Sequence, residues 1–371
     1  MNNPARFQHK KLLASGWRRR WLFHIIALSL GLLLAFGLAE IATRLYVRWR
    51  GQNIELMKPI TGSMQPGRVE QHPFLPMALV PNTEFDMLIK YEFTDNLLAW
   101  HYTTNEAGFR GDSVDIPRSE NSFRVLTLGG SATFGEGVDD DDTWSAQLER
   151  MIQADYPDLK VEVLNFGIPT ATSAHAIVLL ALRGVHYRPD IVIFYEAVND
   201  ISCCLGYENF RTDYSHRFRD FAGLSPLRIV LPDVFYQSYA ITLLNDFWNR
   251  KSGGGGGFVE VWDQPRSANP LNGIEAVHAN INSMRALTES IGGTFILSTY
   301  HFYDPSEVDQ AFNDELRAQA QASGIDLIDQ AALLPTLDKS IHIDGVHFTS
   351  LGNTLVASNI LDYLEIHELI R

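Results

Sequence analysis

Cysteine is nearly absent from this chain, which contains two cysteines in 371 residues, the neighbours Cys203 and Cys204. Adjacent residues rarely reach the geometry of a disulfide, so the sequence predicts no disulfide framework. Two cysteines are too few for a structural zinc site by themselves, and no histidine lies around them at zinc-finger spacing. We therefore expect a fold without disulfides and a function that needs neither a metal nor an organic cofactor.

Positive charge is scarce beyond residue 50. Residues 1–50 hold nine of the 30 basic side chains and, in Glu40, one of the 44 acidic ones. The rest of the chain therefore carries 21 basic and 43 acidic side chains. A surface this acidic repels phosphate groups, which excludes nucleic acid as an expected partner.

A long apolar run lies near the N-terminus. It extends over Trp21–Ala39 and is interrupted only by His24 and Ser29. Nineteen helical residues span about 28 Å, close to the thickness of the hydrocarbon core of a bilayer. We predict a basic tail over residues 1–20 and a transmembrane anchor over residues 21–43.

The charges around this run predict its orientation. Six of the nine basic residues within residues 1–50 precede the run. Because basic flanks stay in the cytoplasm, we expect a cytoplasmic N-terminus and a body outside the cytoplasmic membrane. The alternative is a cleaved signal peptide with Gly37–Ala39 at the cleavage site, although the basic region and the apolar run are both long for one. The body is exported in either case.

The chain beyond the anchor divides into two parts. Residues 44–120 indicate a stalk followed by a small β-rich extension, and residues 121–371 indicate the main domain. In the main domain, apolar segments alternate with segments of helical spacing. The expected strands are 123–128, 161–164, 191–195, 294–298 and 325–328, and the expected helices are 143–156, 173–185, 274–291, 305–322 and 350–367. This alternation predicts a three-layer α/β/α fold with a parallel sheet.

An insertion rich in aromatic residues, 201–273, interrupts the alternation. It contains five consecutive glycines, Gly253–Gly257, which indicate a flexible hinge or tip. No Lys-Ser or Lys-Thr follows the glycines, so they do not predict phosphate binding. Two interpretations remain open: a lid or substrate wall over the site, or a satellite pair of helices that buries its own aromatic side chains.

Polar residues and glycines gather after three expected strands and before the last expected helix. Gly129–Gly135, which contains Ser131, follows the first strand. Asn165–Pro169 follows the second strand, and Glu196–Asp200 follows the third. Asp344–His347 precedes the last helix. Because active sites of parallel sheets lie at the carboxyl ends of the strands, we expect these segments to form one site.

Together these segments contain the groups that acyl transfer needs. A serine hydroxyl becomes a strong nucleophile only when a base removes its proton, and His347 is a suitable base for Ser131. Asp344, three residues earlier, can hold that histidine in one tautomer and stabilise its cation. The N–H groups of Ser131 and Gly167 and the side-chain amide of Asn199 can bind the oxyanion of the tetrahedral intermediate.

The four segments resemble the signature blocks of the SGNH, or GDSL-like, hydrolase superfamily. The resemblance extends from about Phe123 to the C-terminus and implies a flavodoxin-like fold. It also implies a nucleophile, two oxyanion-hole residues and two further triad members, which are Ser131, Gly167, Asn199, Asp344 and His347 respectively.

Two positions depart from the family pattern. Gly130 stands where the family has an aspartate, which is not a triad member, and Ala197 stands where the family has a glycine. Upstream, Asn105 and the run Gly108–Gly111 are similar to bacterial SGNH proteins that carry an N-terminal transmembrane anchor.

These features predict a membrane-anchored serine esterase that removes acyl groups, such as acetyl, from an extracytoplasmic glycan or lipid. The alternative is an O-acyltransferase in cell-surface polysaccharide modification, in which a sugar hydroxyl replaces water. A third possibility is a glycan-binding protein that has kept the fold without activity. The expected partners are the acyl-ester substrate and, through residues 21–43, the membrane.

Overall fold

The computed structural model describes residues 5–49, 69–70, 72, 74–75, 78–116, 118–119, 121–214, 216, 233–251 and 265–370. The chain forms two compact units. We name the first unit, Met1–Pro59 with Leu227–Gly255, the anchor unit after the anchor predicted from its sequence. We name the second unit, Ile60–Pro226 with Gly256–Arg371, the hydrolase unit after the family that its sequence resembles. The insertion 201–273 is therefore divided between the two units.

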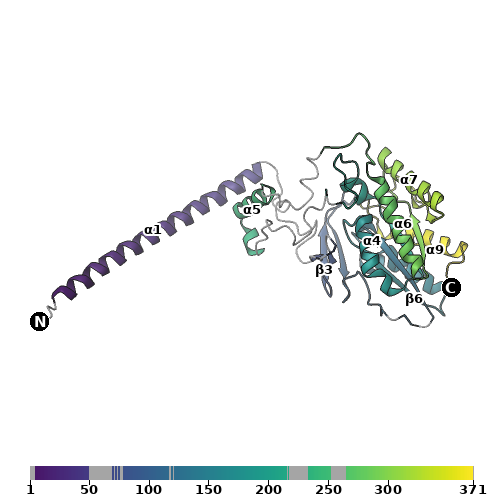
Figure 1. Cartoon of the computed structure of the whole chain (residues 1–371), viewed down its shortest axis with the longest axis horizontal. Helices are drawn as coiled ribbons and strands as arrows, with labels where there is room; N and C mark the ends of the chain where they lie inside the picture. The colour runs from purple at the N-terminus through teal and green to yellow at the C-terminus, as the bar shows by residue number, and fades with distance from the viewer. Residues whose placement is uncertain are drawn as a thin grey trace. The chain divides into compact units, whose positions relative to one another are not determined.

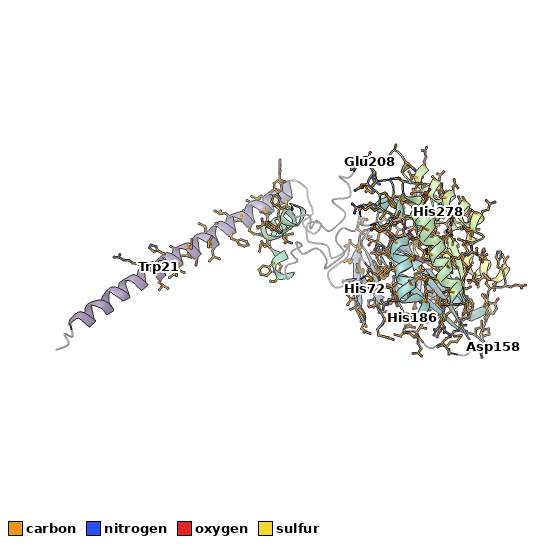
Figure 2. All side chains as sticks on the ribbon, viewed as in Figure 1. Trp21, His72, Asp158, His186, Glu208 and His278 are labelled. Atoms are coloured by element: carbon orange, nitrogen blue, oxygen red, sulfur yellow. The ribbon has the colours of Figure 1, made fainter. Side chains whose placement is uncertain are left out.

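The described residues of the anchor unit form two α-helices (Figure 1) and the short helical turn Asp233–Gln237. Helix α1 is Ala5–Trp49, and helix α5, Tyr239–Lys251, packs against it. Within α1, Arg20–Trp49 is long and apolar enough to cross a membrane, and its most apolar window has no buried residue. Figure 2 shows the side chains of this helix, Trp21 among them, standing away from the ribbon. Length and composition are thus those of a membrane anchor or a signal sequence.

A five-stranded parallel sheet forms the centre of the hydrolase unit, as predicted. The strand order is β6-β5-β7-β8-β9, and all neighbours in the sheet are parallel. The strands are β5 (Ser122–Gly129), β6 (Lys160–Gly167), β7 (Ile191–Tyr195), β8 (Thr294–Ser298) and β9 (Asp326–Ile328). Every residue of β5 and β7 is buried, because both faces of the sheet are covered.

Helices cover both faces of the sheet. The chain runs outward from β5 to β6 through α3 (Trp144–Asp155) and returns to β7 through α4 (Ser173–Leu182). Right-handed crossovers in opposite directions lie on opposite faces, so α3 and α4 cover different faces. Helix α9 (Ser350–Ile366) packs with α3, and α6 (Ile274–Ser290) packs with α4.

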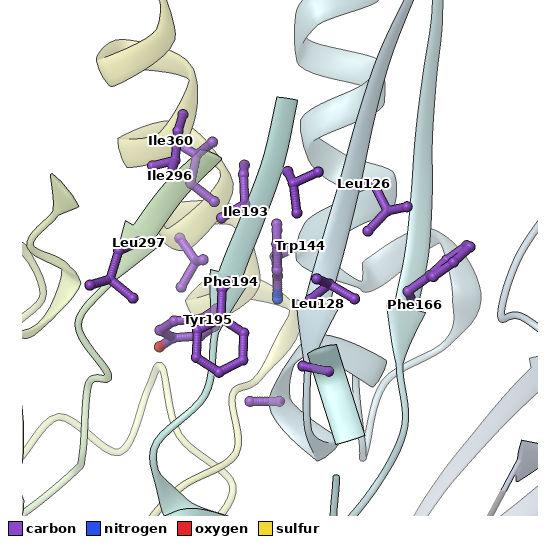
Figure 3. Packing of buried hydrophobic residues seen from close by; sticks show 14 of the residues in the cluster. Leu126, Leu128, Trp144, Phe166, Ile193, Phe194, Tyr195, Ile296, Leu297 and Ile360 are labelled. Carbon is purple, nitrogen blue, oxygen red and sulfur yellow. The ribbon is translucent and has the colours of Figure 1, made fainter. Parts of the chain in front are cut away.

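This topology defines where a site can form. Figure 3 shows Trp144 of α3 and Ile360 of α9 beside Ile193 of the sheet, and all three are buried. The direction of the chain reverses at β5, which lies between β6 and β7. Ligands of open α/β sheets bind at the carboxyl ends of the strands at such a reversal. The segment that contains Ser131 leaves the sheet at this point.

Shorter elements complete the hydrolase unit. An antiparallel hairpin of β3 (Glu84–Ile89) and β4 (Leu98–Thr103) lies in the stretch interpreted as a β-rich extension. Helix α7 (Glu307–Ser323) packs on α6 and β8. The remaining described elements of this unit are β1 (Val69–Glu70), β2 (Ala78–Leu79), α2 (Ser131–Phe134), α8 (Gln330–Leu333) and short helical turns at 140–142, 184–187 and 200–204.

The aromatic residues of the insertion differ in burial. Tyr207 and Tyr214 are buried in the hydrolase unit, whereas Phe247 and Trp248 of α5 are exposed in the anchor unit. The exposure of this second pair does not fit a satellite that buries its own aromatic side chains. The glycine run Gly253–Gly257 lies outside the described residues.

Candidate active site

Ser131 occupies a sharp turn between β5 and the four-residue helix α2. The turn passes very close to β7. A Cβ atom added to Gly130 would lie 2.1 Å from Glu196 Oε2 and 2.4 Å from Asn199 Nδ2. A side chain at position 130 would displace the Glu196 carboxyl group or the Asn199 amide, so the glycine leaves room for both beside the serine.

The Ser131 hydroxyl lies at hydrogen-bond distance from a histidine. His347 Nε2 is 2.7 Å from Ser131 Oγ, and His347 Nδ1 is 2.8 Å from Asp344 Oδ2. The other oxygen of Asp344 accepts hydrogen bonds from the N–H groups of Val346, at 2.9 Å, and His347, at 2.7 Å. The fold thus brings together, across 216 residues, the serine, histidine and aspartate that the sequence predicted.

The charge of Asp344 is stabilised by its surroundings. Burial by itself raises the pKa of this carboxyl group, but the hydrogen bond to His347, the electrostatic attraction of the imidazole and the two backbone N–H groups outweigh it. The pKa of Asp344 therefore lies below its usual value. An ionised Asp344 favours the tautomer of His347 with hydrogen on Nδ1, which leaves Nε2 to accept the hydroxyl proton of Ser131.

Gly167 is at the end of β6, opposite Gly129 of β5. A Cβ atom added to Gly167 would lie 2.1 Å from Phe134 N, so the glycine allows β6 to touch helix α2. Its N–H donates to Asn165 Oδ1 at 2.9 Å. This N–H would have to share that hydrogen bond in order to reach an oxyanion near Ser131.

Asn199 lies beside the serine turn. Its Nδ2 donates one hydrogen bond to Ala171 O at 2.9 Å. The close approach of Nδ2 to Gly130 places the amide next to the segment that carries Ser131.

Glu196 follows β7 directly and is buried beside the serine turn. A glutamate at a strand end is more often solvated or free to contact a substrate. Glu196 Oε1 accepts a hydrogen bond from Asn199 N at 2.7 Å, and the carboxyl group also accepts from the backbone of Gly130 and Ala197. Glu196 thus joins the turn at Gly130 and Ser131 to the asparagine loop, Glu196–Asp200. In the sequence, only its position directly after a strand of apolar residues indicated that Glu196 could be buried.

The pKa of Glu196 follows from this environment. Burial raises the pKa to about 8, because the charged form loses its hydration. The hydrogen bond from Asn199 N opposes this rise, and the negative charge of Asp200 adds to it. Tyr195 and Tyr300 are the other titratable groups that interact with Glu196. Glu196 is therefore mostly neutral at pH 7.

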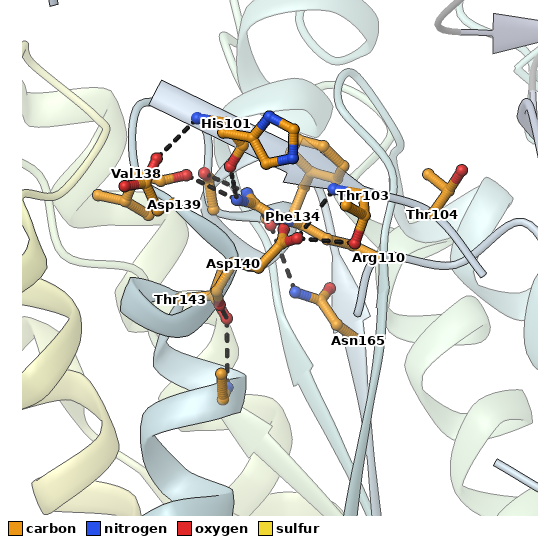
Figure 4. Close-up of polar contacts among 12 residues, drawn as sticks. His101, Thr103, Thr104, Arg110, Phe134, Val138, Asp139, Asp140, Thr143 and Asn165 are labelled. Carbon is orange, nitrogen blue, oxygen red and sulfur yellow. Dashed lines mark hydrogen bonds and ion pairs between the residues drawn. The ribbon is translucent and has the colours of Figure 1, made fainter. Parts of the chain in front are cut away.

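Arg110 holds the far end of the serine turn (Figure 4). Its guanidinium group donates to Phe134 O at 2.9 Å, Gly135 O at 2.6 Å and Val138 O at 2.6 Å. It also forms an ion pair of 2.7 Å with Asp140 and lies over the Phe134 ring at 4.8 Å. Arginine suits this place because its planar fork carries five donors. The sequence pattern gave no structural role to Arg110, which lies in the run Gly108–Gly111.

Neighbouring loops fix the segment that carries His347. Tyr300 Oη donates to Val346 O at 2.7 Å, and Phe93 N donates to Ile343 O at 2.9 Å. The Tyr91 ring meets the His347 ring edge-on, with a centroid separation of 6.4 Å. The imidazole is therefore held from two sides by elements outside its own loop.

Other histidines have structural surroundings. His175 Nδ1 lies 2.8 Å from Thr172 Oγ1 in the N-terminal cap of α4, and His342 stacks on His301. Among the described residues, no group of three histidine, cysteine, aspartate or glutamate side chains could hold a metal ion.

Replacement of Arg110 by methionine is expected to lower the free energy of unfolding by about 3–5 kcal/mol. The substitution leaves Asp140 and three carbonyl groups without their buried cation. Arg150→Met is the matched control, because Arg150 is exposed and lies 3.6 Å from an exposed Asp141. We expect the control to lose less than about 1 kcal/mol. Urea unfolding measures both, and equal losses would contradict the role of Arg110.

Replacement of Glu196 by glutamine is expected to change how stability depends on pH. Between pH 4.5, the ordinary pKa of glutamate, and about pH 8, the unfolded chain loses this proton while the folded protein keeps it. The wild-type protein therefore loses stability over this window as pH rises, and Glu196→Gln does not. Thermal unfolding from pH 4.5 to 8 should show the difference growing in favour of Glu196→Gln. The control is Glu289→Gln at the surface, and parallel curves for the wild type and Glu196→Gln would refute the prediction.

Comparison with known proteins identifies the family of the chain. Residues 127–355, more than half of the chain, match the model of the GDSL-like lipase/acylhydrolase family, and this match includes all five predicted site residues. No match to a curated protein was found.

Several solved structures are similar at low identity. A lipase/acylhydrolase from Enterococcus faecalis is 16% identical, with a TM-score of 0.40, and 66% of this chain and 96% of that chain are covered. An acetylxylan esterase from Geobacillus stearothermophilus is 14% identical, with a TM-score of 0.41 and the same coverage. A GDSL-like lipase from Bacteroides thetaiotaomicron is 15% identical, with a TM-score of 0.40 and coverage of 68% and 93%. On the strength of the family match, the chain belongs to the GDSL-like lipase/acylhydrolase family and is a hydrolase of ester bonds.

Proposed function

We propose that this protein is a membrane-anchored serine esterase that deacylates a glycan or lipid outside the cytoplasmic membrane. The observation that carries the catalytic part is the continuous hydrogen-bonded series from Ser131 Oγ through His347 to Asp344, with distances of 2.7 and 2.8 Å. This is the geometry that serine acyl transfer requires.

In the first step, Ser131 Oγ attacks the carbonyl carbon of the ester while His347 Nε2 takes the hydroxyl proton. The resulting imidazolium is stabilised by Asp344, whose lowered pKa keeps it ionised. Collapse of the tetrahedral intermediate breaks the bond to the alcohol, which leaves with the proton from His347. The acyl group remains on Ser131.

In the second step, water attacks the acyl-serine and His347 takes a proton from it. A second tetrahedral intermediate forms, and its collapse releases the carboxylic acid and returns the proton to Ser131 Oγ. In both intermediates the oxyanion is bound by Ser131 N–H, Gly167 N–H and the Asn199 amide. The nearness of Asn199 Nδ2 to Gly130, and the small residues around the turn, support this assignment.

The membrane part of the proposal rests on α1. Its segment Arg20–Trp49 can cross a bilayer by length and composition, and residues 21–43 form the anchor. The basic residues before Trp21 keep the N-terminus in the cytoplasm, which places the hydrolase unit outside. The substrate is then an ester of the cell envelope.

Ser131→Ala is expected to abolish the hydrolysis of p-nitrophenyl acetate and to prevent covalent labelling by a fluorophosphonate. Mass spectrometry of the wild-type protein should place the adduct on Ser131, and Ser290→Ala, at an exposed serine of α6, should react normally. Folded Ser131→Ala protein that keeps more than a few per cent of the activity would eliminate Ser131 as the nucleophile. Adding a sugar to the same assay distinguishes hydrolysis from acyl transfer. Transfer of the acetyl group to a sugar hydroxyl would indicate an acyltransferase.

Asn199→Ala is expected to lower kcat by about 10²–10³-fold with little change in KM, as is typical of a lost oxyanion donor. Steady-state kinetics on the same ester provides the measurement. A rise in KM at constant kcat would instead assign Asn199 to binding of the substrate ground state.

A further inference from the structure

Helix α5 is attached to α1 through one carboxylate. Glu40 accepts hydrogen bonds from Ser238 Oγ at 2.7 Å, from Tyr239 N at 3.1 Å and from Ala240 N at 3.0 Å. Backbone N–H groups at the start of a helix have no partner within the helix, and the helix dipole favours a negative charge there. Glu40 thus caps the 13-residue helix α5 from another helix.

Arg44, one turn further along α1, strengthens this attachment. It forms an ion pair of 2.7 Å with Glu40 and donates to Gln237 O at 3.4 Å. Its guanidinium group also lies 4.5 Å from the centre of the Tyr239 ring. Val47, one turn beyond Arg44, is buried, whereas the large apolar side chains of Arg20–Trp49 are exposed. The last turns of α1 therefore form the contact face for α5.

The polarity of α5 is inverted relative to that of a helix on a soluble protein. Thr242 and Asn245 are 0% and 6% exposed, although both side chains are polar. Leu244, Phe247 and Trp248 are 67%, 58% and 54% exposed, although all three are large and apolar. The two sets lie on opposite sides of the helix at 100° per residue. A surface helix in water shows the reverse arrangement.

The position of α5 along α1 indicates what its apolar side faces. The apolar run Trp21–Ala39 ends directly before Glu40, so α5 begins beside the last turn of the predicted anchor, residues 21–43. Tryptophan and phenylalanine are favoured at this level of a bilayer, and the exposed Arg48 can pair with lipid phosphates. A carboxylate at this depth is costly without a partner, and α5 supplies that partner.

We propose that α5 is a membrane-surface helix that places Leu244, Phe247 and Trp248 in the outer boundary between headgroups and acyl chains. The bilayer that holds α1 therefore also covers the exposed apolar side of α5. The proposal rests on the proposed anchor over residues 21–43. It makes the insertion 201–273 a second membrane contact, so that the hydrolase unit is tied to the bilayer by the connection after α1 and by both ends of the insertion.

Spin labels on the full-length protein in phosphatidylethanolamine–phosphatidylglycerol nanodiscs test this proposal. Cys203 and Cys204 are first replaced by alanine, and single cysteines then replace Phe247, Leu32 or Glu307. Leu32 is an exposed residue of α1, and Glu307 is an exposed residue of the hydrolase unit. Collisions with oxygen report contact with lipid, and collisions with a water-soluble nickel chelate report contact with water. Hydrolysis of p-nitrophenyl acetate by each labelled protein checks that it is folded.

We expect the label at position 247 to behave like the label at position 32, with high oxygen and low nickel accessibility, and the label at position 307 to show the reverse. A label at 247 that behaves like the one at 307, while 32 remains in lipid, would overturn the α5 proposal and leave the anchor intact. Labels at 247 and 32 that are both in water, or loss of residue 32 from the mature chain, would overturn the anchor itself. A short distance between the 247 labels of two copies would instead identify a second chain as the occupant and would also overturn the proposal.

A variant of the cap tests the attachment to α1 separately. Glu40→Ala should increase the mobility of the label at position 247, because the first turn of α5 loses the acceptor of its N–H groups. Glu92→Ala, in the hydrolase unit, is the matched control and should leave the spectrum unchanged. An unchanged spectrum in Glu40→Ala would show that the carboxylate does not hold α5.

Discussion

The buried guanidinium group of Arg110 is the interaction on which the proposed site most depends. Helix α2 has only four residues, too few to be stable alone, and its carbonyl groups need partners at the end of the turn. Arg110 donates to the carbonyls of Phe134, Gly135 and Val138 at once, while Asp140 balances its charge. Burial lowers the pKa of Arg110, and the charge of Asp140 opposes this effect. The hairpin region before the sheet thereby fixes the turn that presents Ser131.

A buried carboxyl group, that of Glu196, holds the other side of the turn. Glu196 is buried, is mostly neutral at pH 7 and accepts hydrogen bonds from both the serine turn and the asparagine loop. Gly130 leaves the space that this carboxyl group occupies. The turn is thus fixed by a cation at one end and a carboxyl group at the other. The small residues let both approach, and they leave Ser131 Oγ facing His347.

The insertion after β7 connects this chemistry to the anchor unit. Its first residues belong to the hydrolase unit, where Asp200 accepts hydrogen bonds from Ser173 and Tyr214 at the start of α4. Its central helix belongs to the anchor unit, where Glu40 caps it. One chain segment therefore begins beside Asn199 and continues into the unit that contains the apolar helix.

The sequence by itself determined the parallel α/β architecture and the identity of the residues that meet at Ser131. Strand periodicity is local, and the carboxyl ends of parallel strands share one edge, so Gly129–Gly135, Asn165–Pro169 and Glu196–Asp200 had to converge. The Asp344–His347 pair is also local, because three residues separate its members. Only the tertiary structure decided the burial of Glu196, the partners of Arg110 and the capping of α5 by Glu40. Each of these depends on which distant segment fills the space around a side chain, as with the 199 residues between Glu40 and Tyr239. Packing sets that space, and local pattern does not encode it.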